Sequence, residues 1–353
     1  MAIEEVRSAR ILLAGAGHVG LRFLELILLK RDAVRTARGL DLVLVGVADS
    51  SGVAMCPEGL DAGAVIALKS AGRGVAEYPA WGLPGHTVCE MVETAGADIF
   101  LEASPANLRD GQPALGWIEA ALARGMHVVL ANKAPLVHAY SRLVSLAAGH
   151  GVQLRFDATV AGGLPVVNLG QRDLASARIT RLEGLLNLTT SLILGRMADS
   201  GLSYEQAWAE AQAAGHAETD PSLDVEGWDA AAKLVILAQS VLGVPASLGD
   251  VAVEGITSIT RETLRRAAAE GKRIKLLALA ELGKEGYRLT VRPVALPLSH
   301  PLAQLGPEQM GVVFHTDVCG VVSASIVEAT PMPTAFAMLR DLLEIYSHEV
   351  VHP

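Results

Sequence analysis

The chain has 353 residues, enough for roughly two or three domains with a substantial buried core. Hydrophobic residues make up 51% and aromatic residues only 4%, so the core is aliphatic, which favours alternating strands and helices over an all-β sandwich. A formal net charge of −9 argues against nucleic acid and anionic membranes as partners.

The three cysteines, Cys56, Cys89 and Cys319, are far apart and have no CxxC spacing. Free thiols in a reducing cytosol are the simplest interpretation. The N-terminal segment carries acidic residues, and its apolar run is short and broken by glycines. No apolar run is long enough to span a bilayer, so we expect a soluble, cytoplasmic protein without a signal peptide.

The first predicted element is a short strand at 10–14 that ends in a G-x-G-x-x-G turn, followed by a helical pattern. The residues of this turn are Gly15, Ala16, Gly17, His18, Val19 and Gly20. Its glycines permit a tight turn and let a pyrophosphate approach the amides of a helix N-terminus. We therefore expect Gly15, Gly17, His18, Val19 and Gly20 to bind a dinucleotide. The alternative is a glycine turn that only joins two packed elements.

A second buried strand is predicted at 42–48, and it ends at Asp49. An acid at the tip of the second strand can accept hydrogen bonds from an adenosine ribose. The next residues, 50–53, contain no Arg or Lys that could meet a 2′-phosphate, so the sequence favours NAD over NADP. A turn that ends the strand is the alternative role for Asp49.

Two further parallel strands are predicted at 98–102 and 127–130, with a helix at 113–124 between them. Both runs end in small and polar residues, at the edge where open α/β sheets bind ligands. The residues expected to bind the cofactor there are Ser104, Pro105, Asn132 and Lys133. Residues 1–157 are thus predicted to form one doubly wound domain.

The rest of the chain predicts an α+β arrangement. Residues 157–165 are expected to end a strand in a glycine turn. Further strands are predicted at 178–187, 272–280, 286–296 and 310–324, the last three antiparallel. Helices are predicted at 189–199, 203–214, about 225–242 and 333–349, and the last of these closes the fold.

The most informative segment is 216–236, in which four carboxylates precede Lys233. The carboxylates are those of Glu218, Asp220, Asp224 and Asp229. Asp229 and Lys233 are four residues apart in an alanine- and leucine-rich helix, so they share a face that we expect to line the interior or a cleft. A buried lysine needs a partner or loses its charge, and both conditions suit acid/base chemistry. The alternative is an ordinary salt bridge on a surface helix.

These motifs, in this order, resemble those of the homoserine dehydrogenases over nearly the whole chain. The most similar segment is GHAETDPSLDVEGWDAAAKL at 215–234, and the glycine turn, ANKAPL and the turn at 159–165 also match. The resemblance implies a Rossmann domain at 1–157, closed by a C-terminal helix at 331–353, beside an α+β substrate-binding and dimerisation domain at 158–330. It also implies a homodimer that reduces L-aspartate 4-semialdehyde to L-homoserine with NAD(P)H, in threonine and methionine biosynthesis.

The resemblance implies roles for single residues as well. Lys133 and Lys233 would be the catalytic lysines, and Asp229 would orient Lys233. The substrate would be bound by Glu218, Asp224, Asn187 and Thr189, with the first two at its amino group. A structural monovalent cation, Na⁺ or K⁺, would be held by Asp157, Val160, Gly162 and Leu164. The chemistry is coherent without the family name, because an ammonium can neutralise the alkoxide that forms when a hydride reaches an aldehyde. Without that context, Lys133 would be a plain loop lysine.

Three features depart from the family pattern. Leu188 stands where the family has a glycine, and its side chain would project into or against the substrate space. Near the C-terminus, Ile326, Glu328 and Thr330 stand at three glycine positions of a loop beside the cofactor, where a carboxylate would repel a pyrophosphate. Asp157 is one methylene shorter than the expected glutamate.

Three hypotheses follow. The first is an NAD(P)-dependent homoserine dehydrogenase, and the second is a related dehydrogenase for a different small hydroxy or semialdehyde substrate. The third is a catalytically silent nucleotide-binding module, although such a protein has no evident reason to bury Lys133, Asp229 and Lys233 together. Some family members carry a regulatory ACT-type domain after the catalytic region. This chain ends soon after its closing helix, so we expect no such domain.

Overall fold

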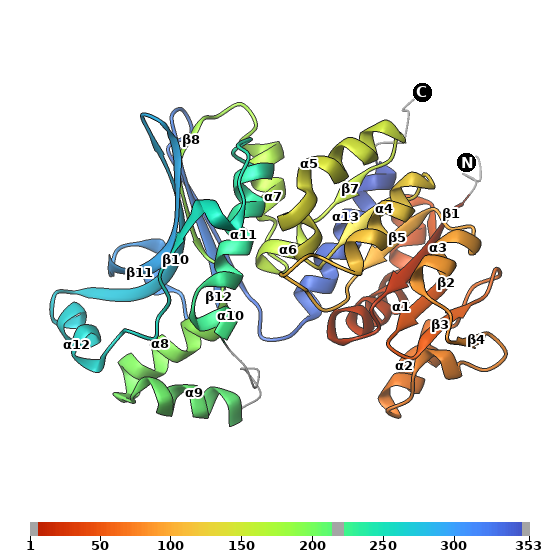
Figure 1. The fold of residues 1–353 in the computed structure, drawn as a ribbon, viewed down its shortest axis with the longest axis horizontal. Helices are drawn as coiled ribbons and strands as arrows, with labels where there is room; N and C mark the ends of the chain where they lie inside the picture. Colours follow the sequence, from red (N-terminus) through yellow and green to blue (C-terminus); the bar gives the residue numbers. More distant parts are fainter. Residues whose placement is uncertain (1–5, 214–221, 348–353) are drawn as a thin grey trace. The chain divides into compact units, whose positions relative to one another are not determined.

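The computed structural model describes residues 6–213 and 222–347 (Figure 1). The chain divides into two compact units, of which the first comprises residues 1–163 and 330–353 and the second residues 164–329. No helix within the described ranges is both long and apolar enough to cross a lipid bilayer.

The first unit contains a seven-stranded sheet with the order β4-β3-β2-β1-β5-β6-β7. Its parallel strands are β1 (Arg7–Ala14), β2 (Leu40–Asp49), β5 (Ile99–Glu102), β6 (His127–Leu130) and β7 (Leu154–Arg155). Two short strands, β3 (Gly52–Met55) and β4 (Gly82–Pro84), extend one edge in antiparallel fashion. All four residues of β5 are buried, as expected for a parallel strand in a sheet covered on both faces.

The helices of the first unit come from both ends of the chain. They are α1 (His18–Arg38), α2 (Ala62–Ser70), α3 (Val88–Thr94), α4 (Ala114–Ala123), α5 (Ala134–Gly149), α6 (Ala158–Ala161) and α13 (Met332–Ser347). Helix α13, blue in Figure 1, packs against α1, and its buried Met338, Leu342 and Ile345 join the same core as β1 and β2. The C-terminal helix therefore completes the core that the N-terminal strand begins.

The second unit contains a six-stranded sheet with the order β13-β12-β8-β10-β11-β9. The strands are β8 (Ile179–Leu185), β9 (Val251–Val253), β10 (Lys272–Gly283), β11 (Gly286–Pro297), β12 (Gln309–Thr316) and β13 (Val321–Val327). The helices are α7 (Val166–Asn168), α8 (Leu188–Ser200), α9 (Tyr204–Ala213), α10 (Ser222–Val225), α11 (Trp228–Ser240) and α12 (Arg261–Ala269). Helices α8, α11 and α12 pack against the central strand β10.

The predicted fold class, a doubly wound parallel sheet plus an α+β unit, is confirmed. Three predicted elements are wrong in extent. The run 310–324 forms the two strands β12 and β13, whose connecting turn is closed by a hydrogen bond from Thr316 N to Gly320 O. The helix expected at 225–242 is divided into α10 and α11 at Gly227, whose φ of 93° is left-handed. The strand expected to lead into 157–165 ends at Arg155, and α6 follows.

Candidate active site

The glycine turn between β1 and α1 is closely packed on one side and open on the other. Gly15 has a φ of 101°, and a Cβ there would lie 2.6 Å from the carbonyl carbon of Ala103, after β5. A Cβ at Gly20 would lie 2.0 Å from the Gly15 carbonyl oxygen, so α1 can begin against the turn only with glycine there. Gly17, the N-cap of α1, would place a Cβ with nothing within 4 Å. The first turn of α1 contains no acidic residue that would repel an anion. This open helix N-terminus is therefore suited to a pyrophosphate.

The next two residues of the turn differ in exposure. His18 is exposed and begins α1, whereas Val19 is half-buried and packs against the core of the first unit.

Asp49 ends β2 with both carboxylate oxygens in use. Its Oδ1 accepts hydrogen bonds from Ser51 N at 2.8 Å and Ser51 Oγ at 2.5 Å, and its Oδ2 accepts from Lys69 Nζ at 2.5 Å and Val75 N at 3.2 Å. Burial raises the pKa of Asp49, but the hydrogen bonds from Lys69, Ser51 and Val75 outweigh it and hold the pKa below its ordinary value. Residues 50–53 contain no Arg or Lys, but α2 brings Lys69 to the end of β2 from 20 residues further along the chain, which the sequence did not indicate.

Glu102 is a further candidate site residue, which the sequence motifs did not single out. It ends β5, is 0% exposed, and accepts a hydrogen bond from Ser104 N at 2.8 Å through Oε1. Burial raises the pKa of Glu102 to about 7, although the hydrogen bonds with Ser104 oppose the shift. Its Oε2 and the Nδ2 of buried Asn132 find no hydrogen-bond partner within the described ranges. The signal was a single acid at the end of the apolar strand Ile99–Glu102.

The loops after β5 and β6 lie at the same edge of the sheet as the glycine turn. Ala103 N donates to Ala14 O, and Ala131 N donates to Glu102 O, each at 2.8 Å. Asn132 Oδ1 accepts a hydrogen bond from Ala134 N at 3.0 Å, at the start of α5. The remaining predicted residues here are half-buried Ser104, exposed Pro105 and half-buried Lys133, the N-cap of α5. The structure thus brings together the predicted cofactor-binding residues of the first unit.

The second unit contains the predicted lysine and its acid. Lys233 lies on α11, with its Nζ 2.8 Å from Asp229 Oδ2, and it donates a hydrogen bond to Leu186 O at 2.6 Å. The side chains of Lys233 and Asp229 are 15% and 11% exposed, respectively. Both oxygen contacts hold the ammonium at the junction of β8, α8 and α11.

Asn187 links this pair to a second carboxylate. Its Nδ2 donates to Asp224 Oδ1 at 2.6 Å and to Asp229 Oδ2 at 2.9 Å, while its Oδ1 accepts from Thr190 N at 2.9 Å and caps α8. One amide therefore fixes two acids against the start of a helix. Thr189 and Leu188, in the first turn of α8, are half-buried.

Two predicted carboxylates of this segment, Glu218 and Asp220, lie outside the described residues. The two lysines belong to different units, Lys133 to the first and Lys233 to the second.

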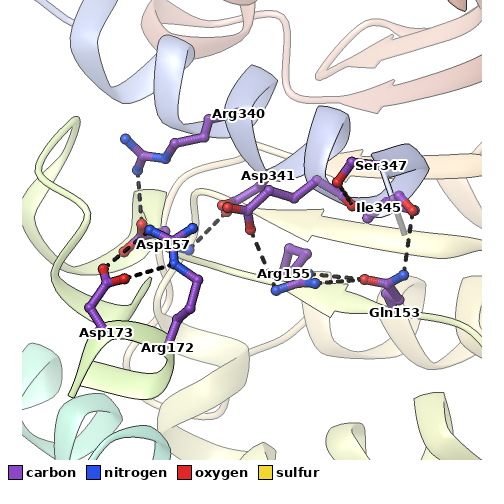
Figure 2. Close-up of polar contacts among 10 residues, drawn as sticks. Gln153, Arg155, Asp157, Arg172, Asp173, Arg340, Asp341, Ile345 and Ser347 are labelled. Carbon is purple, nitrogen blue, oxygen red and sulfur yellow. Dashed lines mark hydrogen bonds and ion pairs between the residues drawn. The ribbon is translucent and has the colours of Figure 1, made fainter. Parts of the chain in front are cut away.

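Asp157, the one carboxylate among the residues expected to hold a cation, binds a guanidinium group. Asp157, Val160 and Gly162 lie at the end of the first unit, and Leu164 begins the second. Asp157 is 2% exposed, and its Oδ2 accepts a hydrogen bond from Arg340 Nη2 at 2.8 Å (Figure 2). These residues do not fit a monovalent cation, because the carboxylate that such an ion needs already binds the arginine.

The three residues that stand at the expected glycine positions near the C-terminus have different surroundings. Ile326 is not in a loop, because it pairs with Met310 within the β12–β13 ladder. Glu328 is 8% exposed and its N–H donates to Glu308 O at 2.8 Å. Thr330 is the first residue of the segment that returns to the first unit.

Comparison with known proteins gives the family. The family model described as homoserine dehydrogenase matches residues 165–343. A homoserine dehydrogenase of Methanocaldococcus jannaschii is 37% identical over 337 residues, which cover 96% of this chain and 98% of that protein. The chain belongs to the homoserine dehydrogenase family.

Two further homoserine dehydrogenases extend the similarity. An NAD(+)-dependent homoserine dehydrogenase of Pseudomonas canavaninivorans is 35% identical, over 96% of each chain. The crystal structure of a homoserine dehydrogenase from Thiobacillus denitrificans has a TM-score of 0.84 at 30% identity and covers 96% of this chain and 73% of its own. The resemblance stated from the motifs is confirmed, and the chain is an NAD(P)-dependent oxidoreductase. The two hypotheses of a different substrate and of a silent module are not favoured.

Proposed function

We propose that this chain interconverts L-homoserine and L-aspartate 4-semialdehyde, with Lys233 as the general acid and base. The observation that carries the proposal is the fixed position of its ammonium group. An ammonium has three N–H donors. Within the described part of the chain, two of them meet Asp229 and the carbonyl of Leu186, at 2.8 and 2.6 Å. The third can donate to a substrate oxygen.

When bound, the nicotinamide cofactor supplies or accepts the hydride. As the aldehyde is reduced, its oxygen develops alkoxide character, and Lys233 Nζ gives that oxygen a proton. In the opposite direction the neutral amine of Lys233 takes the proton from the hydroxyl of homoserine. Asp229 and Leu186 O orient Nζ for both the reduction and the oxidation. The amine is therefore already in position when the proton is transferred.

The substrate's amino group is proposed to bind to carboxylates of the second unit. A charged amino group needs acceptor oxygens, and charge-assisted hydrogen bonds to carboxylates are the strong ones. Asp224 Oδ1 is held by Asn187 at 2.6 Å, which fixes this acid in place. We assign substrate binding to Asp224, Asn187, Thr189 and Glu218.

The cofactor is proposed to bind along the edge of the first sheet. We assign this role to the turn residues Gly15, Gly17, His18, Val19 and Gly20, to Asp49, and to Ser104, Pro105, Asn132 and Lys133. Lys133 is also proposed as the second catalytic lysine, at the N-cap of α5. The dinucleotide-binding domain is proposed to comprise 1–157 with the closing helix at 331–353, and the substrate domain 158–330.

NAD is the proposed cofactor, rather than NADP. The carboxylate of Asp49 at the end of β2 would repel a 2′-phosphate. The relative of Pseudomonas canavaninivorans is NAD(+)-dependent by name and is similar over 96% of this chain. Lys69 opposes this preference, since its ammonium lies beside the same carboxylate at 2.5 Å.

A homodimer formed through the second unit is also proposed. Strand β13 is at the edge of its sheet and exposes alternate residues, including Val321 at 61% and Val327 at 57%. Aliphatic side chains on an exposed sheet edge are better covered by a partner than by water. The free cysteines agree with a cytoplasmic location, which we also propose.

The decisive assay follows NADH absorbance with L-homoserine and NAD. Lys233→Ala is expected to lower kcat at least a thousandfold, about 4 kcal/mol of transition-state stabilisation. The matched control is Lys272→Ala, which removes a lysine paired with Glu270 at the surface. A Lys233→Ala variant with turnover within tenfold of wild type would remove the basis of the proposal.

The same assay tests the alternative of a different substrate. Binding of NAD without oxidation of homoserine would favour that alternative, and a screen of small hydroxy acids would then identify the substrate. Leu188→Gly tests whether the side chain of Leu188 restricts the substrate pocket. If the leucine restricts the pocket, the variant has a lower KM for homoserine than wild type, and an unchanged KM excludes that explanation.

A further inference from the structure

Two consecutive residues of α13 hold Asp157 from both its side chain and its backbone (Figure 2). Arg340 Nη2 donates to Asp157 Oδ2 at 2.8 Å, and the Asp157 N–H donates to Asp341 Oδ2 at 2.9 Å. Asp157 is 2% exposed and Asp341 is 1% exposed. The residue before α6 is therefore bound at two points by one helix.

Arg340 also contacts the turn after α6. Its Nη1 donates to Gly163 O at 3.1 Å, so one guanidinium bridges a buried carboxylate and a backbone carbonyl six residues later. Hard cations take the same kind of ligand, carboxylate and carbonyl oxygens. A guanidinium supplies the same single positive charge, and its N–H groups point at such oxygens in a fixed fork.

The length of the acid agrees with this arrangement. A glutamate at position 157 would carry its carboxylate about 1.5 Å further along the side chain, towards the place that the guanidinium occupies. The shorter aspartate leaves a normal hydrogen-bond distance of 2.8 Å to Arg340 Nη2.

We infer that Arg340 is a built-in cation, which takes the place of a monovalent ion at Asp157 and makes the segment 157–163 independent of Na⁺ and K⁺. Removing one partner of a buried ion pair leaves a charge that the protein must compensate. Without Arg340, Asp157 Oδ2 and the carbonyl of Gly163 lose their hydrogen bonds to the guanidinium, and we expect an ion from solution to take its place.

Thermal unfolding of the full chain in choline chloride, NaCl and KCl at equal ionic strength tests the inference. Wild type is expected to have the same Tm in all three salts, within about 1 °C. Arg340→Met is expected to unfold about 5–10 °C lower in choline chloride and to regain about 3–6 °C in NaCl or KCl. The matched control is Arg155→Met. Arg155 lies on β7, and its Nη1 is 3.6 Å from Oε2 of Glu344 on the same helix. The Tm of this control variant should not differ between the salts.

A double variant identifies the binding group. Asp157→Asn combined with Arg340→Met lacks the carboxylate, so its Tm should be equal in the three salts. Arg340→Lys keeps the charge and should resemble wild type, which provides a test if Arg340→Met does not fold. A wild type that Na⁺ or K⁺ stabilises over choline would overturn the inference, as would an Arg340→Met variant without any response to these ions. The readout is unfolding, so the result is independent of the proposed catalytic activity.

Discussion

Replacing Asp341 by asparagine is expected to change how the stability of the protein depends on pH. Burial, followed by the charge of Asp157, raises the pKa of Asp341 from 3.8 to about 8. The folded protein therefore keeps a proton on this carboxyl at neutral pH, whereas the unfolded chain loses it near pH 4. Asparagine resembles the protonated acid, because it cannot ionise and still offers an oxygen to the Asp157 N–H.

The size of the effect follows from proton linkage. A raised pKa in the folded state contributes stability that is fully present below about pH 4 and is lost by about pH 8. That window is about four pH units wide, and each unit corresponds to ~1.4 kcal/mol. The total is on the order of 5 kcal/mol, a large fraction of the stability of an ordinary domain.

Urea unfolding followed by circular dichroism between pH 5 and pH 8.5 measures this quantity. The free energy of unfolding of Asp341→Asn minus that of wild type should rise steadily with pH and level off above about pH 8. Asp32→Asn, at an exposed position on α1, is the matched control, and its difference from wild type should stay flat. A flat difference for Asp341→Asn as well would refute the reasoning, because it would mean that Asp341 is ionised in the folded protein.

Three further predictions concern the site. Asp49→Asn frees Lys69 for a 2′-phosphate and should raise kcat/KM with NADP relative to NAD about tenfold, a gain that Lys69→Ala in the same background should abolish in the paired steady-state assays. Asn187→Ala removes the amide that fixes Asp229 and should lower kcat roughly tenfold to a hundredfold, whereas an effect on stability alone would contradict a positioning role. Burial raises the pKa of Glu102 to about 7, so its negative charge forms as the pH rises through neutrality and should weaken NAD binding above pH 7. Titration calorimetry should find that the affinity for NAD falls with pH in wild type and stays constant in Glu102→Gln.

Much of the fold was predictable because its elements carry strong local patterns. The strands at 42–48, 98–102 and 127–130 are short apolar runs that end in polar residues, and all three are strands of the first sheet. The strand β4, only three residues long, has no such pattern, since it is defined by pairing with β3. The tight turn within 310–324 was hidden because valines on both sides continue the same β-branched composition.

The site was predictable where its residues are close together in sequence. Asp229 and Lys233 meet because a helix brings positions four apart onto one face. Lys69 and Arg340 were missed because tertiary packing, not spacing, brings them to their acids, and Arg340 is 183 residues from Asp157. The sequence did contain a signal for a buried acid in α13. Asp341 interrupts the apolar face that contains Ala337 and Ile345, which marks an acid that must be buried.

The discontinuity of the first unit bears on how the chain is made on the ribosome. Arg7 in β1 donates a hydrogen bond to Tyr346 O in α13, a contact between residues 339 positions apart. Residues 164–329 form a continuous stretch, so the second unit can finish folding while the earlier-made first unit still lacks its last helix. The first unit is thus begun first and completed last. Until α13 emerges from the ribosome, the apolar surface that this helix covers on the first unit is open to chaperones.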